Sequence, residues 1–525
     1  MTRRKVLFVH PEHQPSYWGF QYSLRLYGKR AMHPPLGLIT VAALLPRDWD
    51  LRLVDMSLEP LTDADLLWAD LIFTGGMTSQ AVSLVEVLKR CRALGRTTVV
   101  GGPFPSGHPS RLEGLPDHFV LDEAELTLPQ FLADLEAGAP RPLYRAETKP
   151  DVTKTPVPRF DLLKLQRYGA IDIQFSRGCP FNCEFCDIIT LFGRVPRAKT
   201  PEQTLAEFQA LLDLGYRGPI FLVDDNFIGN KKAVRLLLEK MIPWMEARSY
   251  PFLITTEASL NLAEDKPLLD SMRRAGFKRV FLGIETPSIE ALKESQKLQN
   301  MHGDMVEAVH TIIDHNIEVM GGFIVGFDND TEDIFDRQIE FIVKADIPWA
   351  MTGVLAAIPN TQLWTRLEKE GRLLGYHSGD QFGATNFVTR MPADQLMRGY
   401  LHILEHVYDP EAYFQRTWSL IERLVKAGHP NLHRGLMHFG QIAYVTLVAL
   451  VVQGVLSTYR GAWWRFMWRL VTTYPEKYVV GLMNSVVGHH FIRFTRDILD
   501  AERAQRRNRV VVGQLGDTAD GPGKP

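Results

Sequence analysis

The stretch Ser176-Arg-Gly-Cys179-Pro-Phe-Asn-Cys183-Glu-Phe-Cys186 decides how the rest of this sequence is interpreted. Its cysteines are spaced C-x3-C-x2-C, so that one tight loop can present three thiolates to three corners of an iron–sulfur cubane. Such clusters are normally bound by four cysteine thiolates. The nearby sequence supplies only three. The spacing therefore predicts a cluster with one iron left open for a substrate or cofactor.

A zinc site is the main alternative for these cysteines. Zinc requires four nitrogen or sulfur ligands in a closed tetrahedron, and the nearest histidines, His118 and His302, are far away in the sequence. The remaining cysteine, Cys91, lies in a helical pattern and is predicted to be a small buried side chain. Three cysteines within eight residues are also no disulfide framework, which is denser and spread through a short secreted chain.

Composition narrows the class of protein. The chain has 525 residues, 45% hydrophobic and 23% charged, with a net charge of -2. These values are typical of a soluble globular protein of two or three domains and give no sign of a nucleic-acid partner. The apolar stretch Val6–Val9 is too short for a signal peptide. We therefore expect a cytoplasmic protein, in which thiolates remain reduced and available to iron.

The cysteine motif follows the first of six strand-like segments that are separated by helical patterns. The six candidate strands are Ile171–Phe175, Ile220–Val223, Phe252–Thr256, Arg279–Ile284, Val319–Val325 and Thr352–Ala356. Six such units predict a partial (β/α)6 TIM-like barrel over residues 166–370. The chemistry of such barrels lies at the carboxyl ends of the strands, which is where the cysteines are.

Residues 1–140 predict a separate α/β domain of Rossmann-like type, followed by a Pro- and charge-rich linker over residues 141–165. Its candidate strands are Lys5–Val9, Leu51–Val54, Leu71–Thr74, Thr98–Val100 and His118–Leu121. Strands that alternate with helices favour a parallel sheet covered on both faces. Glycine-bearing turns follow several strand ends, where open α/β sheets bind their ligands.

Residues 371–502 predict a mostly helical third domain, and residues 503–525 a disordered tail. The apolar segment Ile442–Leu456 has roughly 15 residues, fewer than a membrane span needs. Its composition favours a buried helix. The alternative is an apolar wall or interfacial surface, because arginines and the tryptophans Trp463, Trp464 and Trp468 follow it.

The cysteine motif, with Phe185 just before its last cysteine, resembles the signature of the radical S-adenosylmethionine (SAM) superfamily. The resemblance implies a [4Fe–4S] cluster bound by Cys179, Cys183 and Cys186, with SAM chelating the open iron. It also implies reductive cleavage of SAM to a 5′-deoxyadenosyl radical that abstracts a hydrogen atom from the substrate. An electron donor such as flavodoxin or ferredoxin is implied as a partner.

Later strand ends match the places where this family binds SAM. The resemblance assigns Asp224, Asp225 and Asn226 to the SAM amine, Glu285 to its ribose, Gly322, Ile324 and Gly326 to its adenine, and adds Glu257 at the third strand end. Each has an ordinary alternative, because glycines occur in strands and the glutamates can cap helices. The basic residues Arg194, Arg197 and Lys199 either face the SAM carboxylate or belong to a solvated loop.

The first domain resembles the cobalamin-binding domains that precede many radical SAM barrels. The resemblance rests on His33-Pro-Pro-Leu-Gly-Leu38, on Val54-Asp55 and on Gly101-Gly102-Pro103. It implies cobalamin contacts at Ser79, Gly101, Gly102 and Pro103, where glycines permit close backbone approach. The motif D-x-H-x-x-G, which supplies a cobalt ligand in other cobalamin proteins, is absent, so the lower axial ligand stays open. An inherited scaffold with an empty site is the alternative.

The C-terminal part resembles the extra domain of a radical SAM subgroup that includes the hopanoid methylases. The matching segments, here and in the barrel, are Asp224–Asn230, Gly326–Asp330, Asp336–Phe341 and Gly488–Phe491. The resemblance implies a cobalamin-dependent C-methyltransferase for an apolar, lipid or isoprenoid-like small molecule, with peripheral membrane contact as a further expectation. A radical SAM oxidoreductase or cyclase without methyl transfer, and an iron–sulfur sensor or scaffold, are the alternatives.

Overall fold

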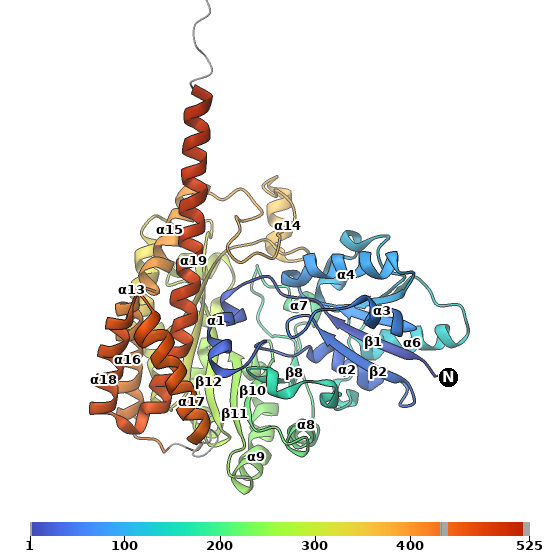
Figure 1. Cartoon of the computed structure of the whole chain (residues 1–525), viewed down its shortest axis with the longest axis horizontal. Helices are drawn as coiled ribbons and strands as arrows, with labels where there is room; N and C mark the ends of the chain where they lie inside the picture. Colours follow the sequence, from blue (N-terminus) through green and yellow to red (C-terminus); the bar gives the residue numbers. More distant parts are fainter. Residues whose placement is uncertain (1–2, 431, 433–438, 518–525) are drawn as a thin grey trace, which may run out of the picture.

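The computed structural model describes residues 3–430, 432 and 439–517, with the backbone alone for residues 505–517. Figure 1 shows the N-terminal α/β domain beside a larger body, in which a second sheet is covered by helices on its outer side. The long helix α19 (Tyr478–Asp517) runs along this body and projects beyond it.

The first sheet is parallel throughout, with the strand order β2-β1-β3-β4-β5-β6. Its strands are β1 (Lys5–His10), β2 (Asp50–Asp55), β3 (Leu71–Gly75), β4 (Thr97–Gly101), β5 (His118–Val120) and β6 (Leu143–Tyr144). Its helices are α2 (Leu36–Leu44), α3 (Asp63–Trp68), α4 (Ala81–Ala93), α5 (Pro103–Gly107) and α6 (Ala124–Glu136). Successive side chains of a strand point to opposite faces, so Val6 and Phe8 join one core and Leu7 and Val9 the other. The predicted Rossmann-like sheet is confirmed.

The segment expected to be a linker contributes to this first sheet. Leu143 and Tyr144 pair with Phe119 and Val120 of β5. The Tyr144 hydroxyl also donates a 2.9 Å hydrogen bond to Asp134 of α6. The first sheet therefore extends past residue 140, because a two-residue strand with a buried tyrosine lies within the Pro-rich passage.

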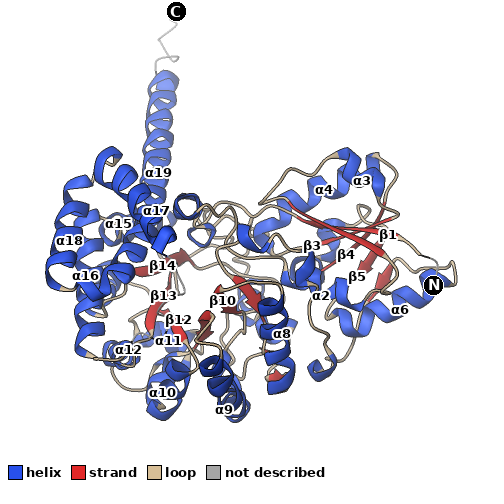
Figure 2. Cartoon of the chain, turned by 60° about the horizontal axis from the view of Figure 1, so that its bottom comes forward, coloured by secondary structure: helices blue, strands red, loops and turns tan. Residues whose placement is uncertain are grey.

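The second sheet is also parallel and follows the chain, with the order β14-β13-β12-β11-β10-β7. Its strands are β7 (Ile171–Ile173), β10 (Gly218–Leu222), β11 (Phe252–Ala258), β12 (Phe277–Glu285), β13 (Glu318–Val325) and β14 (Trp349–Val354). The covering helices are α8 (Pro201–Asp213), α9 (Lys231–Ala247), α10 (Lys266–Arg274), α11 (Ile289–Glu294), α12 (Met305–Asp314) and α13 (Ile334–Lys344). Figure 2 shows α8 to α12 around the outer side of the curved sheet. All six predicted strands of the partial barrel are present.

The third part is helical, as predicted, and shares a continuous core with the barrel. After α14 (Gln362–Lys369) it contains α15 (Ala393–Val407), α16 (Pro410–Lys426), α17 (Phe439–Ala449), the π-helix η11 (Leu450–Leu456), α18 (Arg460–Thr473) and α19. The N-terminal segment crosses to this part. The ring of Tyr17 lies 5.6 Å from Phe491 and 5.3 Å from Phe494 of α19.

One prediction for the third part is wrong. The apolar segment is not a buried helix, because only 22% of the Phe439–Leu456 helix is buried. The backbone of α19 is helical to Asp517, within the segment 503–525 that was predicted as a disordered tail, and residues 518–525 lie outside the described residues. The run from Arg503 to Arg509 contains four arginines, which favour helix, and no proline occurs between Tyr478 and Pro522.

The carboxyl ends of the two sheets face each other. Glu123, just after β5, accepts hydrogen bonds from Arg177 at 2.8 Å and from Arg197 at 2.7 Å, both beside the cysteine loop. The hydroxyl of Tyr168 donates to Asp55 at the end of β2, at 2.9 Å. Glu123 is almost fully buried. The Glu123 ion pairs therefore hold the two carboxyl edges together, while Tyr168 connects the first domain to the chain just before β7.

Candidate functional site at the facing strand edges

The cysteine loop leaves β7 and returns through a short antiparallel pair, β8 (Ser176–Arg177) with β9 (Arg197–Ala198). Gly178 has φ +94°, and a Cβ at this position would lie 2.7 Å from the Gly193 carbonyl oxygen. The amide of Cys179 donates to that same oxygen at 3.3 Å. The glycine is therefore required here, because it lets the loop fold back on itself with all three cysteines on one short segment.

Asp224 and Asp225, at the end of β10, hold this loop. The Asp224 carboxylate accepts from the amides of Phe175 and Ser176, at 2.8 and 2.7 Å. Asp225 accepts from the amide of Gly178 at 2.9 Å. Burial raises the pKa of Asp224 to about 7 and that of Asp225 to about 6. The first function of this pair is therefore to fasten the cysteine loop to the neighbouring strand.

Two amide side chains lie against the cysteine thiols. Asn226 directs its Nδ2 at the Cys179 sulfur, at 3.9 Å, and Gln299 directs its Nε2 at the Cys183 sulfur, at 3.6 Å. The carbonyl oxygens of both side chains, and that of Asn300, are buried without a hydrogen-bond partner in the described part of the chain. Buried polar atoms are almost always paired. The unpaired amide oxygens of Asn226 and Gln299 therefore fit a polar group bound beside the thiols.

A buried ion pair lies next to the thiols. The ammonium group of Lys297 is 2.7 Å from Glu285. Burial alone lowers the pKa of Lys297, but Glu285 and the thiols of Cys183 and Cys186 outweigh it, so the net pKa is raised. Glu285 has φ +67° at a register shift between β12 and β13. The carboxylate expected to meet the SAM ribose is thus paired with a lysine that the sequence analysis did not identify.

Lys297 and Gln299 belong to no sequence motif that would have predicted their place in the site. The available signal was the polar run Ser295-Gln-Lys-Leu-Gln-Asn300 directly after α11, in which Ser295, Gln299 and Asn300 are buried. Asn300 donates to the carbonyls of Gly283 and Ile284, at 2.8 and 3.1 Å. This run therefore supports the end of β12 and supplies two side chains to the site.

Glu257, at the end of β11, adds a third carboxyl group to the Asp224–Asp225 pair. Burial, followed by the negative charges of Asp225 and Asp224, raises its pKa to about 8. Burial also raises the pKa of Cys186 to about 12. Both groups favour their neutral forms unless a positive charge lies nearby. A bound metal, for the thiol, and an ammonium group, for the carboxyls, are the ligands that match this environment.

The glycines in β13 and directly after it have structural roles. A Cβ on Gly322 would lie 2.6 Å from the Phe281 ring of β12. Gly326 has φ +105°, and its amide donates to Asp330 at 2.7 Å. Ile324 and Phe185 both pack against the small core around Phe327. The close approach of Phe281 and the turn into Asp330 explain these glycines, so a contact with adenine remains a prediction.

Two basic residues of the cysteine loop and Cys91 do not lie where they could bind SAM or the cluster. Arg197 pairs with Glu123, and Lys199 pairs with buried Glu207, so neither is available to a SAM carboxylate as suggested from the sequence. Cys91 is buried in α4, as predicted. Among the described residues no three His, Cys, Asp or Glu side chains gather around a single-ion site. A cubane differs, since each thiolate binds its own iron at a separate corner.

The strand ends of the first domain are closely packed. A Cβ on Gly101 would lie 2.5 Å from the Val120 carbonyl oxygen, while Gly102 has φ +91° and Pro103 starts the short helix α5. Ser79 is 3.0 Å from the imidazole of His13. The close approach of Val120 in β5 therefore explains why Gly101 has no side chain. The expected cobalamin residues Ser79, Gly101, Gly102 and Pro103 all lie at this edge, facing the barrel.

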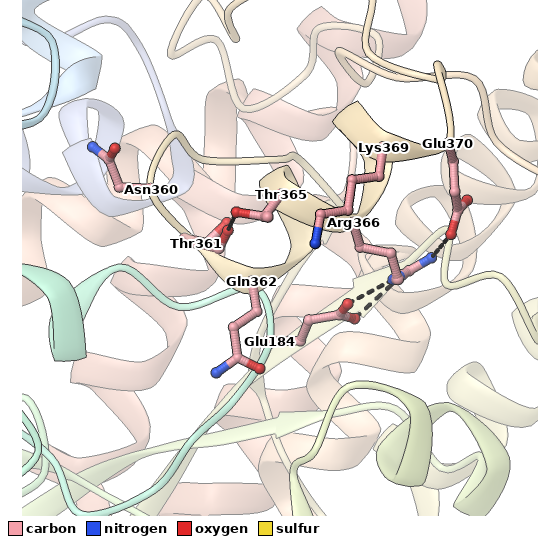
Figure 3. Close-up of a pocket in the computed structure, with 8 residues that line it drawn as sticks. All are labelled: Glu184, Asn360, Thr361, Gln362, Thr365, Arg366, Lys369 and Glu370. Atoms are coloured by element: carbon pink, nitrogen blue, oxygen red, sulfur yellow. Dashed lines mark hydrogen bonds and ion pairs between the residues drawn. The ribbon is translucent and has the colours of Figure 1, made fainter.

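An open polar pocket flanks the outside of the cysteine loop. Figure 3 shows Arg366 of α14 directed at Glu184, which lies between Cys183 and Phe185 in the sequence. The guanidinium group is 2.6 Å from Glu184 and 2.8 Å from Asp328. The pocket contains none of the thiols, and its residues fasten α14 over the cysteine loop.

Two family models match the chain. The radical SAM superfamily matches residues 173–342, and a domain of unknown function, DUF4070, matches residues 361–504. The first match spans the cysteine loop and the strands β10 to β13 that carry the carboxyl groups. The second covers α14 and the helical part.

Two relatives match this chain over nearly its whole length. An uncharacterized methyltransferase of Synechocystis is 39% identical over 98% of this chain and 96% of the relative. The hopanoid C-2 methylase of Rhodopseudomonas palustris is 34% identical over 94% of each chain. Among solved structures, the radical SAM methyltransferase TsrM of Kitasatospora setae, with cobalamin and a [4Fe–4S] cluster bound, shares the fold. It has a TM-score of 0.58 and 13% identity, over 81% of this chain and 99% of that chain.

The matches agree with the geometry of the site. This chain combines three cysteines on one loop, acidic strand ends and an α/β domain that faces a barrel. A radical SAM enzyme uses a [4Fe–4S] cluster and SAM. The chain belongs to the radical SAM methyltransferase family that includes the hopanoid C-2 methylase.

Proposed function

We propose that this enzyme is a cobalamin-dependent C-methyltransferase acting on an apolar, lipid or isoprenoid-like substrate. The observation that carries the proposal is the facing of two strand edges across the Glu123–Arg177–Arg197 ion pairs. One edge belongs to a Rossmann-like sheet and the other carries the cysteine loop. Such an arrangement allows two cofactors to meet one substrate, which a single-cofactor oxidoreductase or a sensor does not need.

Cys179, Cys183 and Cys186 are the proposed cluster ligands, while Asn226 and Gln299 hydrogen-bond the thiolates and Lys297 offsets their charge. Charge-assisted hydrogen bonds are about twice as strong as neutral ones. When bound, the cluster and SAM supply the radical that removes a hydrogen atom, and cobalamin supplies the methyl group. The protein positions these groups relative to one another and excludes water from the site.

Asp225 and Glu257 are the proposed partners of the SAM ammonium group. Both are buried with raised pKa values, so a bound cation stabilises their ionised forms. Asp224 acts indirectly, because its oxygens accept from the loop backbone. Glu285, Gly322, Ile324, Gly326 and Phe185 remain the proposed surroundings of the nucleoside.

Ser79, Gly101, Gly102 and Pro103 are the proposed contacts of cobalamin. Their edge also carries His10 and His13, whose pKa values burial lowers to about 4. Both imidazoles are therefore neutral at physiological pH, so cobalamin would meet no imidazolium charge at this edge. None of the four predicted residues supplies a strong cobalt ligand, in keeping with the missing D-x-H-x-x-G motif.

An apolar substrate is supported by the inner face of the barrel. Phe281 lies on the same strand face as Gly283, beside the Glu285–Lys297 pair. Its ring is 4.8 Å from that of Trp18, and the ring of Phe221 is 5.0 Å from that of His33. These half-buried rings offer an apolar wall near the proposed radical site. The hopanoid C-2 methylase relative supports the same substrate class.

Anaerobic reconstitution tests the proposal. Protein loaded with iron, sulfide and cobalamin is incubated with SAM, a reductant such as reduced flavodoxin and a bacterial lipid extract. We expect 5′-deoxyadenosine and S-adenosylhomocysteine in similar amounts, and neither from the Cys183→Ala variant. Deoxyadenosine without S-adenosylhomocysteine, from protein that retains cobalamin, would indicate an oxidoreductase or cyclase instead.

A further inference from the structure

Helix α17, its continuation η11 and helix α18 present a contiguous apolar face to the solvent. Among the described residues one helix, Phe439–Leu456, is long and apolar enough to cross a membrane, yet it is mostly exposed. We call the exposed face the apolar surface. Its members are Tyr444, Leu447, Val451 and Val455 on α17–η11, and Trp464, Trp468 and Val471 on α18.

The exposed side chains of α17–η11 follow one stripe of the helix. Tyr444, Leu447, Val451 and Val455 are spaced by three or four residues, which places them on one side. The opposite side, with Val445, Ala449, Gln453 and Gly454, is buried against the protein. A core helix would be buried all round. This one is packed on one side and left apolar on the other.

Helix α18 extends the same surface through a tight contact. The indole nitrogen of Trp464 donates to the Gly454 carbonyl at 2.9 Å, and a Cβ on Gly454 would lie 2.7 Å from the Trp463 ring. Trp468 and Val471 follow Trp464 by four and seven residues, on the same side of α18. The two exposed stripes are therefore joined at the π-helix, where Gly454 permits the approach.

The charged residues of the segment that forms the apolar surface are all basic. From Phe439 to Pro475 the chain contains Arg460, Arg465 and Arg469 and no acidic residue or lysine. Arg465 and Arg469 form ion pairs with Glu411 and Glu422 of α16, at the edge of the surface. Tryptophan, tyrosine and arginine around an apolar stripe are the composition of helices that lie in a membrane interface.

We propose that the apolar surface docks this enzyme onto one leaflet of an anionic lipid bilayer. The helix lies along the bilayer and does not cross it, since its other side is packed on the protein and Thr446 is 2.8 Å from Tyr478 of α19. A second copy of the chain is the competing occupant of this surface, and the experiment below distinguishes it from a bilayer. Docking would give the enzyme direct access to a membrane lipid, the substrate class of the proposed function.

Vesicle flotation of the full chain tests the docking. Vesicles of phosphatidylcholine alone are compared with vesicles containing one third phosphatidylglycerol. We expect the protein to float with both and more strongly with the anionic ones. Leu447→Glu combined with Trp468→Glu, at side chains 62% and 72% exposed, should lower the bound fraction at limiting lipid by about tenfold or more. The matched control is Leu67→Glu with Leu236→Glu, 54% and 49% exposed on the helices α3 and α9, and should bind like the wild type.

Three results would overturn the docking. The first is a wild-type protein that does not float with vesicles, and the second is equal vesicle binding by the two double variants. The third is a dimer in solution that the L447E/W468E variant dissociates, with no binding of the wild type to vesicles. The assay needs neither SAM nor turnover. Failure of flotation therefore leaves methyl transfer untouched, and an enzyme without methyl transfer can still float.

Discussion

At the residue scale, the site is organised by buried polar side chains that have two roles. Asp224 and Asp225 fasten the cysteine loop, and Asn226 and Gln299 approach the thiols from opposite segments of the chain. The Glu285–Lys297 pair lies beside them. Substitutions here therefore act on the contacts that hold the loop, on the polar surroundings of the thiols, or on both.

The carboxyl groups predict an unusual dependence of stability on pH in the metal-free protein. Burial raises the pKa of Glu257 to about 8 and those of Asp224 and Asp225 to about 7 and 6, against about 4 in an unfolded chain. Between these values the native state binds more protons than the unfolded state. The free energy of unfolding therefore falls as pH rises from about 4 to 8.

Glu257→Gln should flatten this dependence. Near pH 4 the variant and the wild type should be equally stable, and at pH 8 the variant should be more stable by an amount on the order of a few kcal/mol. Denaturant unfolding of the metal-free proteins across this range measures the difference. A wild type that gains stability toward pH 8, or a variant with the same slope, would show that these carboxyl groups ionise normally.

At the element scale, short helices and strand ends outside the barrel hold the cysteine loop. Arg366 of α14 bonds Glu184 in the loop and Asp328 after β13. The contact joins two segments more than 140 residues apart along the chain. Helix α14 therefore acts as a clamp on the loop from its outer side (Figure 3).

Arg366→Ala should release this clamp. Glu184 is nearly buried, and the loss of charged hydrogen bonds to it costs roughly 1–3 kcal/mol. We expect less iron per chain after gel filtration and faster bleaching of the cluster absorbance in air. Arg398→Ala, which removes an exposed pair with Asp394 within α15, is the control. Equal iron retention in the two variants would mean that α14 does not stabilise the loop.

The sequence predicted regular elements better than their surroundings. Strand alternation located both parallel sheets, but β6 is two residues long and gives no periodic signal. The apolar run at Ile442–Leu456 was correctly interpreted as helical and wrongly as buried, because composition does not specify what covers a helix. Cys179, Cys183 and Cys186 were identified by local spacing, whereas Lys297 reaches the thiols only through the fold.

At the scale of the whole molecule, function depends on how the first domain is held against the barrel. Glu123 is buried between Arg177 and Arg197, and Arg177 also pairs with Glu125 at 2.8 Å. Both arginines flank the cysteine loop. The same contact therefore orients the cluster site and the edge proposed to bind cobalamin.

Glu123→Ala should weaken this contact. Two guanidinium groups lose a buried partner, at a cost of up to about 3–5 kcal/mol, reduced by the remaining Glu125. We expect cobalamin affinity to fall about tenfold or more in equilibrium dialysis, with the helix content unchanged. Asp134→Ala, which removes a pair with Arg141 inside the first domain, should bind cobalamin normally. Unchanged affinity in Glu123→Ala would place the cofactor away from the facing edges.

The central claim is that one enzyme uses both edges to place a methyl group on an apolar carbon. The most direct test uses SAM with a deuterated methyl group, cobalamin-loaded enzyme and an extracted bacterial lipid mixture. The account predicts a lipid that carries three deuterium atoms, formed with one deoxyadenosine and one S-adenosylhomocysteine for each product. Deoxyadenosine produced by the fully loaded enzyme together with an altered lipid that carries no deuterium would contradict it.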